Sequence, residues 1–421
     1  MRVVHERCCG LDIGQALVVA CLLIGKAGGK VRREIRRFGT FRKDLEALRD
    51  WLLEEECTHV GMESTGIYWM PIHAVLEDHF EVVVGNAHHI KHVPGRKTDV
   101  KDTEWLADLL RHGLIAPSFV PPKPIRELRR LTRFRRKLVE ARTAECNRVL
   151  GLLETAGIKL ASVASNVFGV SGRRMLDALL QGTQDPVAVA QLARGRLRRK
   201  IAQLELALDA RLDELHCSLI QRQLRRVDLF DQEISEIDGL IEVRIEPYRT
   251  QYELLMQVPG ISKVVAAVII AELGVDMAVF LSSRHAAAWA GVAPSNNESA
   301  GRRGRTPARK GNPHLRTALI EAAIAAARTK DSYFRTKYYR LRARRGAKRA
   351  AMAIAHKLLI VAYHVLATGE PYRDLGLSYL DKLDRKHNTN KLVRRLERMG
   401  YRVTLLKPPD GSNAASEAPF S

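Results

Sequence analysis

Long apolar runs are scarce in this 421-residue chain. The longest candidate, ALVVACLLIG at residues 16–25, is shorter than the roughly 18 residues that a membrane-spanning helix needs. The amino terminus also lacks the basic, apolar and small-residue order of a secretory signal peptide. These absences argue against a membrane as partner, so we expect a protein of the cytoplasm.

The chain also lacks paired cysteine motifs, and it has fewer acidic than basic residues. None of the six cysteines stands in C-x-x-C spacing, which argues against a zinc site or a disulfide framework and favours reduced thiols. The chain has 69 Lys and Arg against 47 Asp and Glu, a formal net charge of +22 and a pI near 10.0. Such an excess of positive charge predicts a polyanionic partner, and nucleic acid is a better candidate than an anionic membrane.

The first part of the chain alternates between strand-like and helix-like patterns. Apolar strand candidates end at Asp12 and Glu63, and EVVVGNA at residues 81–87 has the pattern of another buried strand. Three early strands followed by alternating helices and strands predict an α/β domain with a mixed sheet over residues 1–122. The Pro-rich stretch at 116–124 marks its end.

Helical patterns dominate beyond this break. Residues 123–250 are predicted to form a basic helical, coiled-coil-like segment, in which apolar residues recur every three or four positions from Leu197 to Leu219. That spacing fits either an oligomer seam or one long helix packed on its own domain.

The carboxy-terminal half is predicted to be mainly α-helical over residues 251–370. Its Pro259-Gly260 break resembles a helix-hairpin-helix, although a plain turn between two packed helices explains it equally well. A helix–strand extension over 371–407 and a disordered tail over 408–421 complete the expected organisation.

Basic residues are concentrated in two helical stretches. Residues 123–148 contain ten Lys or Arg against three acids, and residues 328–349 contain ten more against one. Cations on a helix face neutralise phosphates, so both stretches are candidates for nucleic-acid binding. The cations that we nominate there and in the Gly- and Arg-rich loop at 291–311 are Arg129, Arg130, Arg133, Arg136, Lys137, Arg302, Arg303, Arg305 and Lys310.

Two acids three residues apart stand in KTDVKDTEWLADLL at residues 97–110. Asp99 and Asp102 would be neighbours at a helix start, where the helix dipole by itself also favours acids. Asp12 and Glu63 each end a predicted strand of the same sheet, and sites in α/β sheets form beyond strand ends. Four carboxylates meeting there would offer hard oxygen ligands to Mg²⁺ or Mn²⁺, and two such ions can clamp the attacking and leaving oxygens of a phosphodiester.

The motifs GLDIG, GMESTG and KTDVKDTEWLADLL resemble the Asp-Glu-Asp-Asp tetrad of the DEDD insertion-sequence transposases. VPGISKVVAAVIIAELG and AAWAGVAPSNNESAGRRGRTPARKGNPHLRTAL are similar to the carboxy-terminal transposase domain of that family. The resemblance implies a RuvC-like, RNase H-type amino-terminal domain and an enzyme that moves an insertion sequence by DNA recombination in the bacterial cytoplasm or nucleoid. Because such enzymes are similar to bridge-RNA-guided recombinases, it also implies donor and target DNA, a structured guide RNA and a homo-oligomer, dimer or tetramer.

The resemblance further implies roles for individual residues. Ser299, in ESAGRRGR, would form a covalent link to a DNA phosphate. Ala300 stands where many members have Thr or Gly, so Ser295 is kept as the second candidate nucleophile. The implied ligands of the divalent metal are Asp12, Glu63, Asp99 and Asp102.

Three other functions stay open. A RuvC-like, metal-dependent junction nuclease would use water instead of a serine. An actin-like ATPase or sugar kinase could use LDIGQALVVACLLIGKAGG as a phosphate loop, but it needs a second Asp-Gly loop and a Gly-Gly adenosine turn, which we do not find after residue 150. A non-catalytic nucleic-acid-binding protein would use the acids only as helix caps.

Overall fold

The computed structural model describes residues 2–64, 66–87, 90, 102–294, 298–299, 302–303 and 311–406. The chain divides into two compact units, Met1–Pro121 and Pro122–Ser421. The first contains a mixed sheet and the second is almost entirely helical, which confirms the expected order of an α/β part and a mainly α part.

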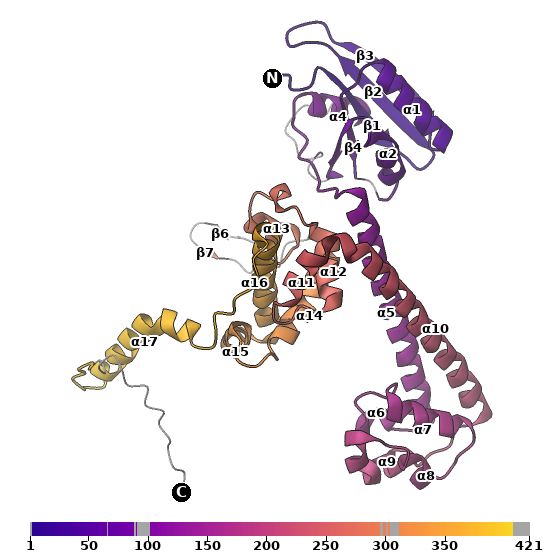
Figure 1. Cartoon of the computed structure of the whole chain (residues 1–421), viewed down its shortest axis with the longest axis vertical. Helices are drawn as coiled ribbons and strands as arrows, with labels where there is room; N and C mark the ends of the chain where they lie inside the picture. The colour runs from indigo at the N-terminus through magenta and orange to yellow at the C-terminus, as the bar shows by residue number, and fades with distance from the viewer. Residues whose placement is uncertain are drawn as a thin grey trace. The chain divides into compact units, whose positions relative to one another are not determined.

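A five-stranded sheet forms the centre of the first unit (Figure 1). Its strands are β1 (Arg7–Ile13), β2 (Leu17–Ile24), β3 (Arg32–Gly39), β4 (His59–Glu63) and β5 (Glu81–Gly85). Their order is β3-β2-β1-β4-β5. Strand β2 is antiparallel to both β1 and β3, whereas β4 is parallel to β1 and β5 is parallel to β4. The central strand β1 and its parallel neighbour β4 therefore end at the same edge of the sheet.

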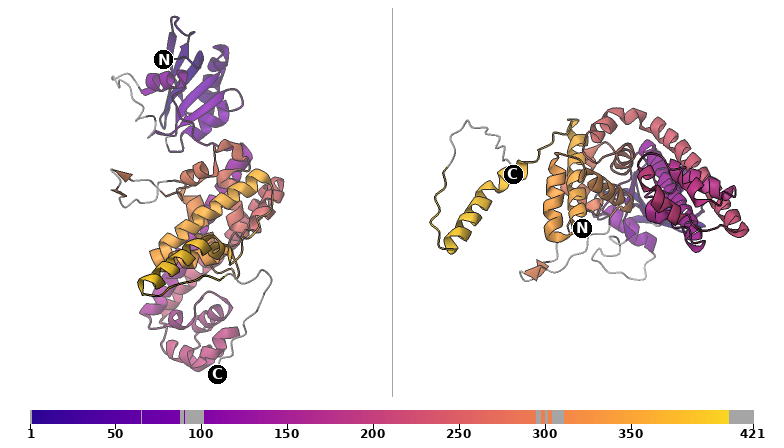
Figure 2. Two further views of the ribbon diagram at one scale, coloured as in Figure 1. Left: turned by 90° about the vertical axis from the view of Figure 1, so that its left-hand side faces the viewer. Right: turned by 90° about the horizontal axis from the view of Figure 1, so that it is seen from below.

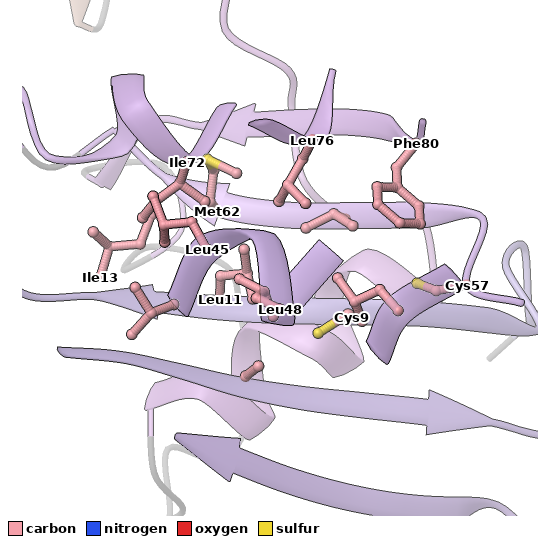
Figure 3. Packing of buried hydrophobic residues seen from close by; sticks show 14 of the residues in the cluster. Cys9, Leu11, Ile13, Leu45, Leu48, Cys57, Met62, Ile72, Leu76 and Phe80 are labelled. Atoms are coloured by element: carbon pink, nitrogen blue, oxygen red, sulfur yellow. The ribbon is translucent and has the colours of Figure 1, made fainter. Parts of the chain in front are cut away.

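Alternation along β1 divides its side chains between two faces. Cys9, Leu11 and Ile13 belong to the core on the face that α1 (Arg42–Glu54) and α2 (Trp69–Leu76) cover (Figure 3). Each apolar side chain that is fully buried in such a core stabilises the fold by about 1.5–3 kcal/mol.

The opposite face of β1 contacts α4 (Asp102–Arg111). Cys8 packs there in a second cluster with Leu106 and Ala107. A Cβ atom at Gly10 would lie 2.5 Å from the backbone nitrogen of Ala107. Because no side chain fits into that space, glycine is what allows α4 to lie directly on the strand.

Replacing Gly10 with alanine should push α4 away from β1 and lower the free energy of unfolding of the first unit by about 1–3 kcal/mol. Gly29→Ala is the matched control, because its Cβ would meet only the oxygen of Lys26 at 3.6 Å, an ordinary contact. Tryptophan fluorescence during urea unfolding measures the effect, because three of the four tryptophans lie in this unit. Equal midpoints for the two variants would contradict the close packing of strand and helix.

Two long helices form an antiparallel pair in the second unit (Figure 1). They are α5 (Lys123–Thr155) and α10 (Glu214–Ile245). Arg135 pairs with Asp238 at 2.5 Å, and Arg142, seven residues later, pairs with Asp231, seven residues earlier. This reversed order of partners follows from the antiparallel arrangement.

The expected continuous seam from Leu197 to Leu219 is wrong as a single helix. The segment is divided among a 3-10 helix η1 (Gly195–Lys200), α9 (Ile201–Ala207) and the start of α10. Asp213 begins α10 by accepting a hydrogen bond from the backbone nitrogen of His216 at 2.7 Å, so a new helix starts within the periodic pattern. The coiled-coil-like contact is made between α5 and α10.

Residues 156–213 form a small subdomain between the end of α5 and the start of α10, which we call the tip (Figure 1 and Figure 2). Besides η1 and α9 it contains α6 (Leu160–Val163), α7 (Val170–Leu180) and α8 (Pro186–Ala190). Leu204 and Leu208, which the periodic pattern included, are buried in its core. The first part of the leucine pattern therefore reports packing inside this subdomain, whereas Leu215 and Leu219, on α10, are exposed.

Helices α11–α16 form the carboxy-terminal bundle of the second unit. They are α11 (Arg249–Met256), α12 (Lys263–Leu273), α13 (Ser283–Trp289), α14 (Pro313–Ala326), α15 (Tyr333–Arg345) and α16 (Ala347–Thr368). Val258 and Ile261, in the turn between α11 and α12, are buried. The two helices expected on either side of Pro259-Gly260 are present, and the turn that joins them packs inside the bundle.

Two expectations for the carboxy-terminal half need correction. The extension contains α17 (Tyr379–Arg398), but no strand forms over the described residues 401–406. Helix α16 is long and apolar enough to cross a membrane, although no run of that length was expected. Half of its apolar window is buried inside the protein, as is usual for a core helix, so it is weak evidence for a membrane segment. The predicted disordered tail lies outside the described residues.

Candidate active site

Asp12 and Glu63 lie at the ends of neighbouring strands, where Glu63 is the last residue of β4 and Asp12 is the next-to-last residue of β1, which ends one residue later than expected. In the parallel pairing of β1 with β4, Leu11 stands opposite Met62, so the next residues along both strands are Asp12 and Glu63. Both belong to the sheet face that contacts α4, because they follow Gly10 and Gly61 by two positions and a Cβ at Gly61 would lie 3.1 Å from Leu110. Asp12 is exposed and Glu63 is half-buried.

Helix α4 brings a third acid to this end of the sheet. Its carboxy-terminal end lies at the start of β1, where the Val4 nitrogen donates to the Arg111 carbonyl at 2.9 Å. The carbonyl oxygen of Thr103, the second residue of α4, would be 2.9 Å from a Cβ at Gly10. The helix therefore runs antiparallel to β1, and Asp102, its exposed first residue, lies toward the end of the strand that carries Asp12.

These three acids share one end of the unit, while Asp99 lies outside the described residues. Within the described part of the chain, no group of three or more His, Cys, Asp or Glu side chains is close enough to hold a metal ion. The chemistry of the donors fits Mg²⁺ or Mn²⁺, because carboxylate oxygens are the ligands that these cations prefer. The four-carboxylate metal site remains a prediction, and the backbone arrangement is compatible with it.

The loop that contains Ser299 is closed at its base. The Asn312 nitrogen donates to the Trp289 carbonyl at 3.0 Å, and a Cβ at Gly311 would lie only 2.3 Å from the Gly291 nitrogen. The two ends of the loop at 291–311 thus touch, and we call this contact the neck of the loop.

A short hairpin lies within this loop. Strands β6 (Glu298–Ser299) and β7 (Arg302–Arg303) are antiparallel, and the backbone of Ser299 stands opposite that of Arg302. This pairing brings the candidate nucleophile and one candidate phosphate ligand together in the backbone. Ser295, Arg305 and Lys310 lie outside the described residues.

A buried carboxylate supports the neck of the loop. Glu272, on α12, is fully buried and accepts two hydrogen bonds from the guanidinium of Arg133, at 2.7 and 2.8 Å. The side-chain amide of Asn312 donates to it at 2.6 Å, and Arg129 approaches it at 3.2 Å. Burial raises the pKa of Glu272, but hydrogen bonding to Arg133 and the two nearby positive charges outweigh this effect, so the pKa lies below its ordinary value.

Asn312 connects this network to the loop. Its side-chain oxygen accepts hydrogen bonds from the backbone nitrogens of His314 and Leu315, at 3.0 and 3.1 Å, and so caps α14 as the sequence pattern predicts. One side chain therefore joins the buried carboxylate, the start of α14 and the last residue of the loop. The only signal for Glu272 in the sequence is that it is a single acid inside the apolar stretch VVAAVIIAELG, and this pattern alone does not indicate a buried network.

Most of the α5 cations nominated for nucleic-acid binding make hydrogen bonds or ion pairs with other residues of the chain. Arg129 donates to the carbonyls of Ala271 and Glu272 at 2.9 and 2.8 Å, and burial lowers its pKa to about 10. Arg136 pairs with Glu140 and Glu321, and Lys137 pairs with Glu140. Of the five nominated residues on this helix, Arg130 is exposed and has no ion pair within the described part of the chain. Arg129 and Arg133 accordingly have structural contacts that the sequence did not indicate.

Two family models match the chain. Residues 9–158 match a model of DEDD transposases of the IS110 type, and residues 252–339 match the model described as "Transposase IS116/IS110/IS902 family". Together the two matches cover more than half of the chain, and residues 159–251 lie between them.

Curated relatives agree with these matches. The chain is 28% identical to the insertion element IS900 uncharacterized 42 kDa protein of Mycobacterium paratuberculosis, over 64% of this chain and 71% of the relative. It is 27% identical to a probable family 20 transposase of Pseudomonas aeruginosa, over 67% and 75% of the two chains. It is 26% identical to the transposase for insertion sequence element IS1111A of Coxiella burnetii, over 68% and 71%. The chain is therefore a transposase that belongs to the IS110-type DEDD transposase family.

Proposed function

We propose that this transposase is a DNA recombinase that cuts and rejoins strands through a serine–DNA phosphodiester, with divalent cations and a structured guide RNA. The observation that supports the metal chemistry best is the pair Asp12 and Glu63 at the ends of adjacent parallel strands, with Asp102 at the start of the helix beside them. The sheet order, with β1 in the centre, supports an RNase H-like fold of the RuvC type for the first unit.

The proposed chemistry assigns distinct roles to the two halves. Asp12, Glu63, Asp99 and Asp102 would hold Mg²⁺ or Mn²⁺, which stabilises the charge that develops on the oxygens of a reacting phosphate when it is bound. The Ser299 hydroxyl oxygen forms a bond to phosphorus and loses its proton, while the bond from phosphorus to one strand breaks and the departing oxygen takes up a proton. The reverse step, with the hydroxyl of another strand, releases the serine and rejoins the DNA.

The acids and the serine belong to different units of the chain. We propose that a homo-oligomer, a dimer or tetramer, brings them to the same donor and target DNA in the bacterial cytoplasm. The pairing of Ser299 with Arg302 in the β6–β7 hairpin supports an arginine beside the reacting phosphate, because guanidinium groups match phosphate oxygens.

Replacing Asp12 with asparagine should lower the rate of DNA strand cleavage more than about 100-fold, since residues that only support a metal ligand are already worth about 10–100-fold. Removing divalent cations with a chelator should have a similar effect on the unmodified protein, and added Mg²⁺ or Mn²⁺ should restore cleavage. The measurement is cleavage of a labelled DNA that carries the element's ends.

Asp50→Asn is the matched control in the same unit, because Asp50 is an exposed acid that pairs with Arg49 on α1. It should leave cleavage unchanged. Cleavage by Asp12→Asn at the rate of this control, or full cleavage in the presence of chelator, would refute the metal site. Metal-dependent cleavage without any covalent protein–DNA adduct would instead favour a junction nuclease that uses water.

A further inference from the structure

Ion pairing divides the cations of the second unit into two groups. On α5, Arg133, Arg135, Arg136 and Arg142 each pair with a carboxylate of another helix, at nitrogen–oxygen distances between 2.5 and 2.7 Å. A guanidinium that already holds a carboxylate adds little net positive charge to the surface. The basic run that is most conspicuous in the sequence is therefore largely neutralised within the fold.

The cations in one short segment of the tip are different. Arg194, Arg196, Arg198 and Arg199 stand in ARGRLRRK at 193–200 and are all exposed. Within the residues that the structure describes, none of these four side chains makes an ion pair, whereas Lys159 and Arg173 of the same subdomain pair with Glu154 and Asp228. Lys200, also exposed, donates to the Val163 carbonyl at 3.0 Å and keeps its charge. This short segment thus concentrates uncompensated positive charge.

A hollow of about 470 Å³ lies beside these residues. Arg194, Arg196 and Lys200 line it together with neutral polar side chains, and no carboxylate is among its lining residues. The neutral polar side chains are Ser165, Asn166 and Ser171. Arginine, lysine, serine and asparagine are the side chains that commonly contact nucleic-acid phosphates.

The backbone of this segment is held in place. The Arg194 nitrogen donates to the Ser171 hydroxyl at 2.9 Å, which ties the start of η1 to α7. Leu204 of α9 and Leu208, directly after that helix, are buried and anchor the other end in the core of the tip. The charged side chains therefore extend from a fixed backbone, which reduces the entropy lost when they bind a partner.

We propose that this basic tip, formed by Arg194, Arg196, Arg198, Arg199 and Lys200, binds the phosphodiester backbone of a nucleic acid. The surface lies between the two regions that match transposase models, 9–158 and 252–339, so membership of the family does not assign it. The inference rests on the proposed function only in that nucleic acid is the substrate, and it adds a second contact outside the proposed chemistry. Backbone contacts of this kind orient a protein on nucleic acid without reading its sequence.

The test compares two full-length variants, each of which loses four positive charges at different places in the chain. One carries Arg194→Gln, Arg196→Gln, Arg198→Gln and Arg199→Gln. The control replaces four cations that are already ion-paired in the fold. These control changes are Arg32→Gln, Arg42→Gln, Arg49→Gln and Lys159→Gln.

Binding of a duplex DNA of arbitrary sequence and of a folded RNA hairpin is measured by fluorescence anisotropy over a range of salt concentrations. If three phosphate contacts are lost, the slope of log affinity against log salt on duplex DNA should become shallower by roughly 3, and affinity at about 0.1 M salt should fall roughly 100-fold or more. The control should change the slope by less than about 1. A loss restricted to DNA or to RNA supports the proposal and identifies which nucleic acid occupies the tip.

Equal slopes for the tip variant and the control on both ligands would overturn the proposal. If circular dichroism shows that the fourfold variant does not fold, the double variant Arg196→Gln, Arg198→Gln replaces it. The slope of log affinity against log salt is then compared with that of the control in the same way. Failure of the proposed function is separable, because Ser299→Ala should lose the covalent adduct while it keeps the full salt dependence of binding.

Discussion

Replacing Ser299 with alanine should abolish the covalent protein–DNA adduct and lower strand cleavage by about 10⁴-fold or more, as removal of a nucleophile does in other enzymes. The reason is chemical, since alanine cannot form the phosphodiester that the proposed reaction requires. The effect should fall on the chemical step, so DNA affinity should stay within about two-fold of the parent. The adduct is measured as a shift of labelled DNA that survives denaturation and disappears on proteolysis.

Ser295→Ala is the matched control, because it removes a second hydroxyl from the same loop. It should leave adduct formation intact. An adduct formed by Ser299→Ala but not by Ser295→Ala would transfer the role of nucleophile to Ser295. Adduct formation by both variants would refute a serine of this loop as the attacking group.

Replacing Glu272 with alanine should lower the free energy of unfolding of the second unit by about 3–5 kcal/mol. The change leaves the buried guanidinium of Arg129 without its carboxylate and removes the acceptor for Arg133 and Asn312. Thermal unfolding followed by far-ultraviolet circular dichroism reports this unit, because it holds most of the helix. A loss below about 1 kcal/mol, the size expected of an exposed ion pair, would contradict the network.

The same carboxylate should make stability depend on pH. The pKa of folded Glu272 lies below its ordinary value of 4.5, so its contribution is fully present above about that pH and is lost as the pH falls through the lower folded value. The stability difference between the parent and Glu272→Ala should therefore be constant near neutral pH and shrink only in acid. A difference that grows on acidification would have the wrong sign.

Exchanging the amide of Asn312 and the carboxylate of Glu272 tests whether their hydrogen bond, and not only the size of the two side chains, stabilises the protein. Asn312→Asp keeps the cap of α14 but places a second carboxylate 2.6 Å from Glu272, so it should destabilise the protein. Adding Glu272→Gln should recover part of the loss, because the amide and the carboxylate then exchange roles. Exposed Glu321→Gln, on α14, is the control for loss of an acid near the same helices.

The sequence predicted the elements whose cause is local. The strand that carries Asp12 near its end, the short strand that ends at Glu63 and the cap at Asn312 all depend on alternation or on hydrogen bonds within a few residues. The prediction of one continuous helix from Leu197 to Leu219 is wrong for a related reason. Periodicity reports which side of a helix is apolar, and the leucine spacing continues across the break before Glu214 although Leu215 and Leu219 are exposed, so it does not mark where one helix ends and the next begins.

The sequence by itself therefore determined the mixed sheet, the helical second half, the acids at the strand ends and the excess of positive charge. Only the tertiary structure decided which positive charges remain free. Arg133 meets Glu272 across 139 positions of sequence and Arg135 meets Asp238 across 103. By contrast, the four exposed arginines of the tip at 194–199 make no ion pair within the described residues. The physical reason is that the field of a charge depends on its neighbours in space, and those neighbours are fixed only when distant helices pack.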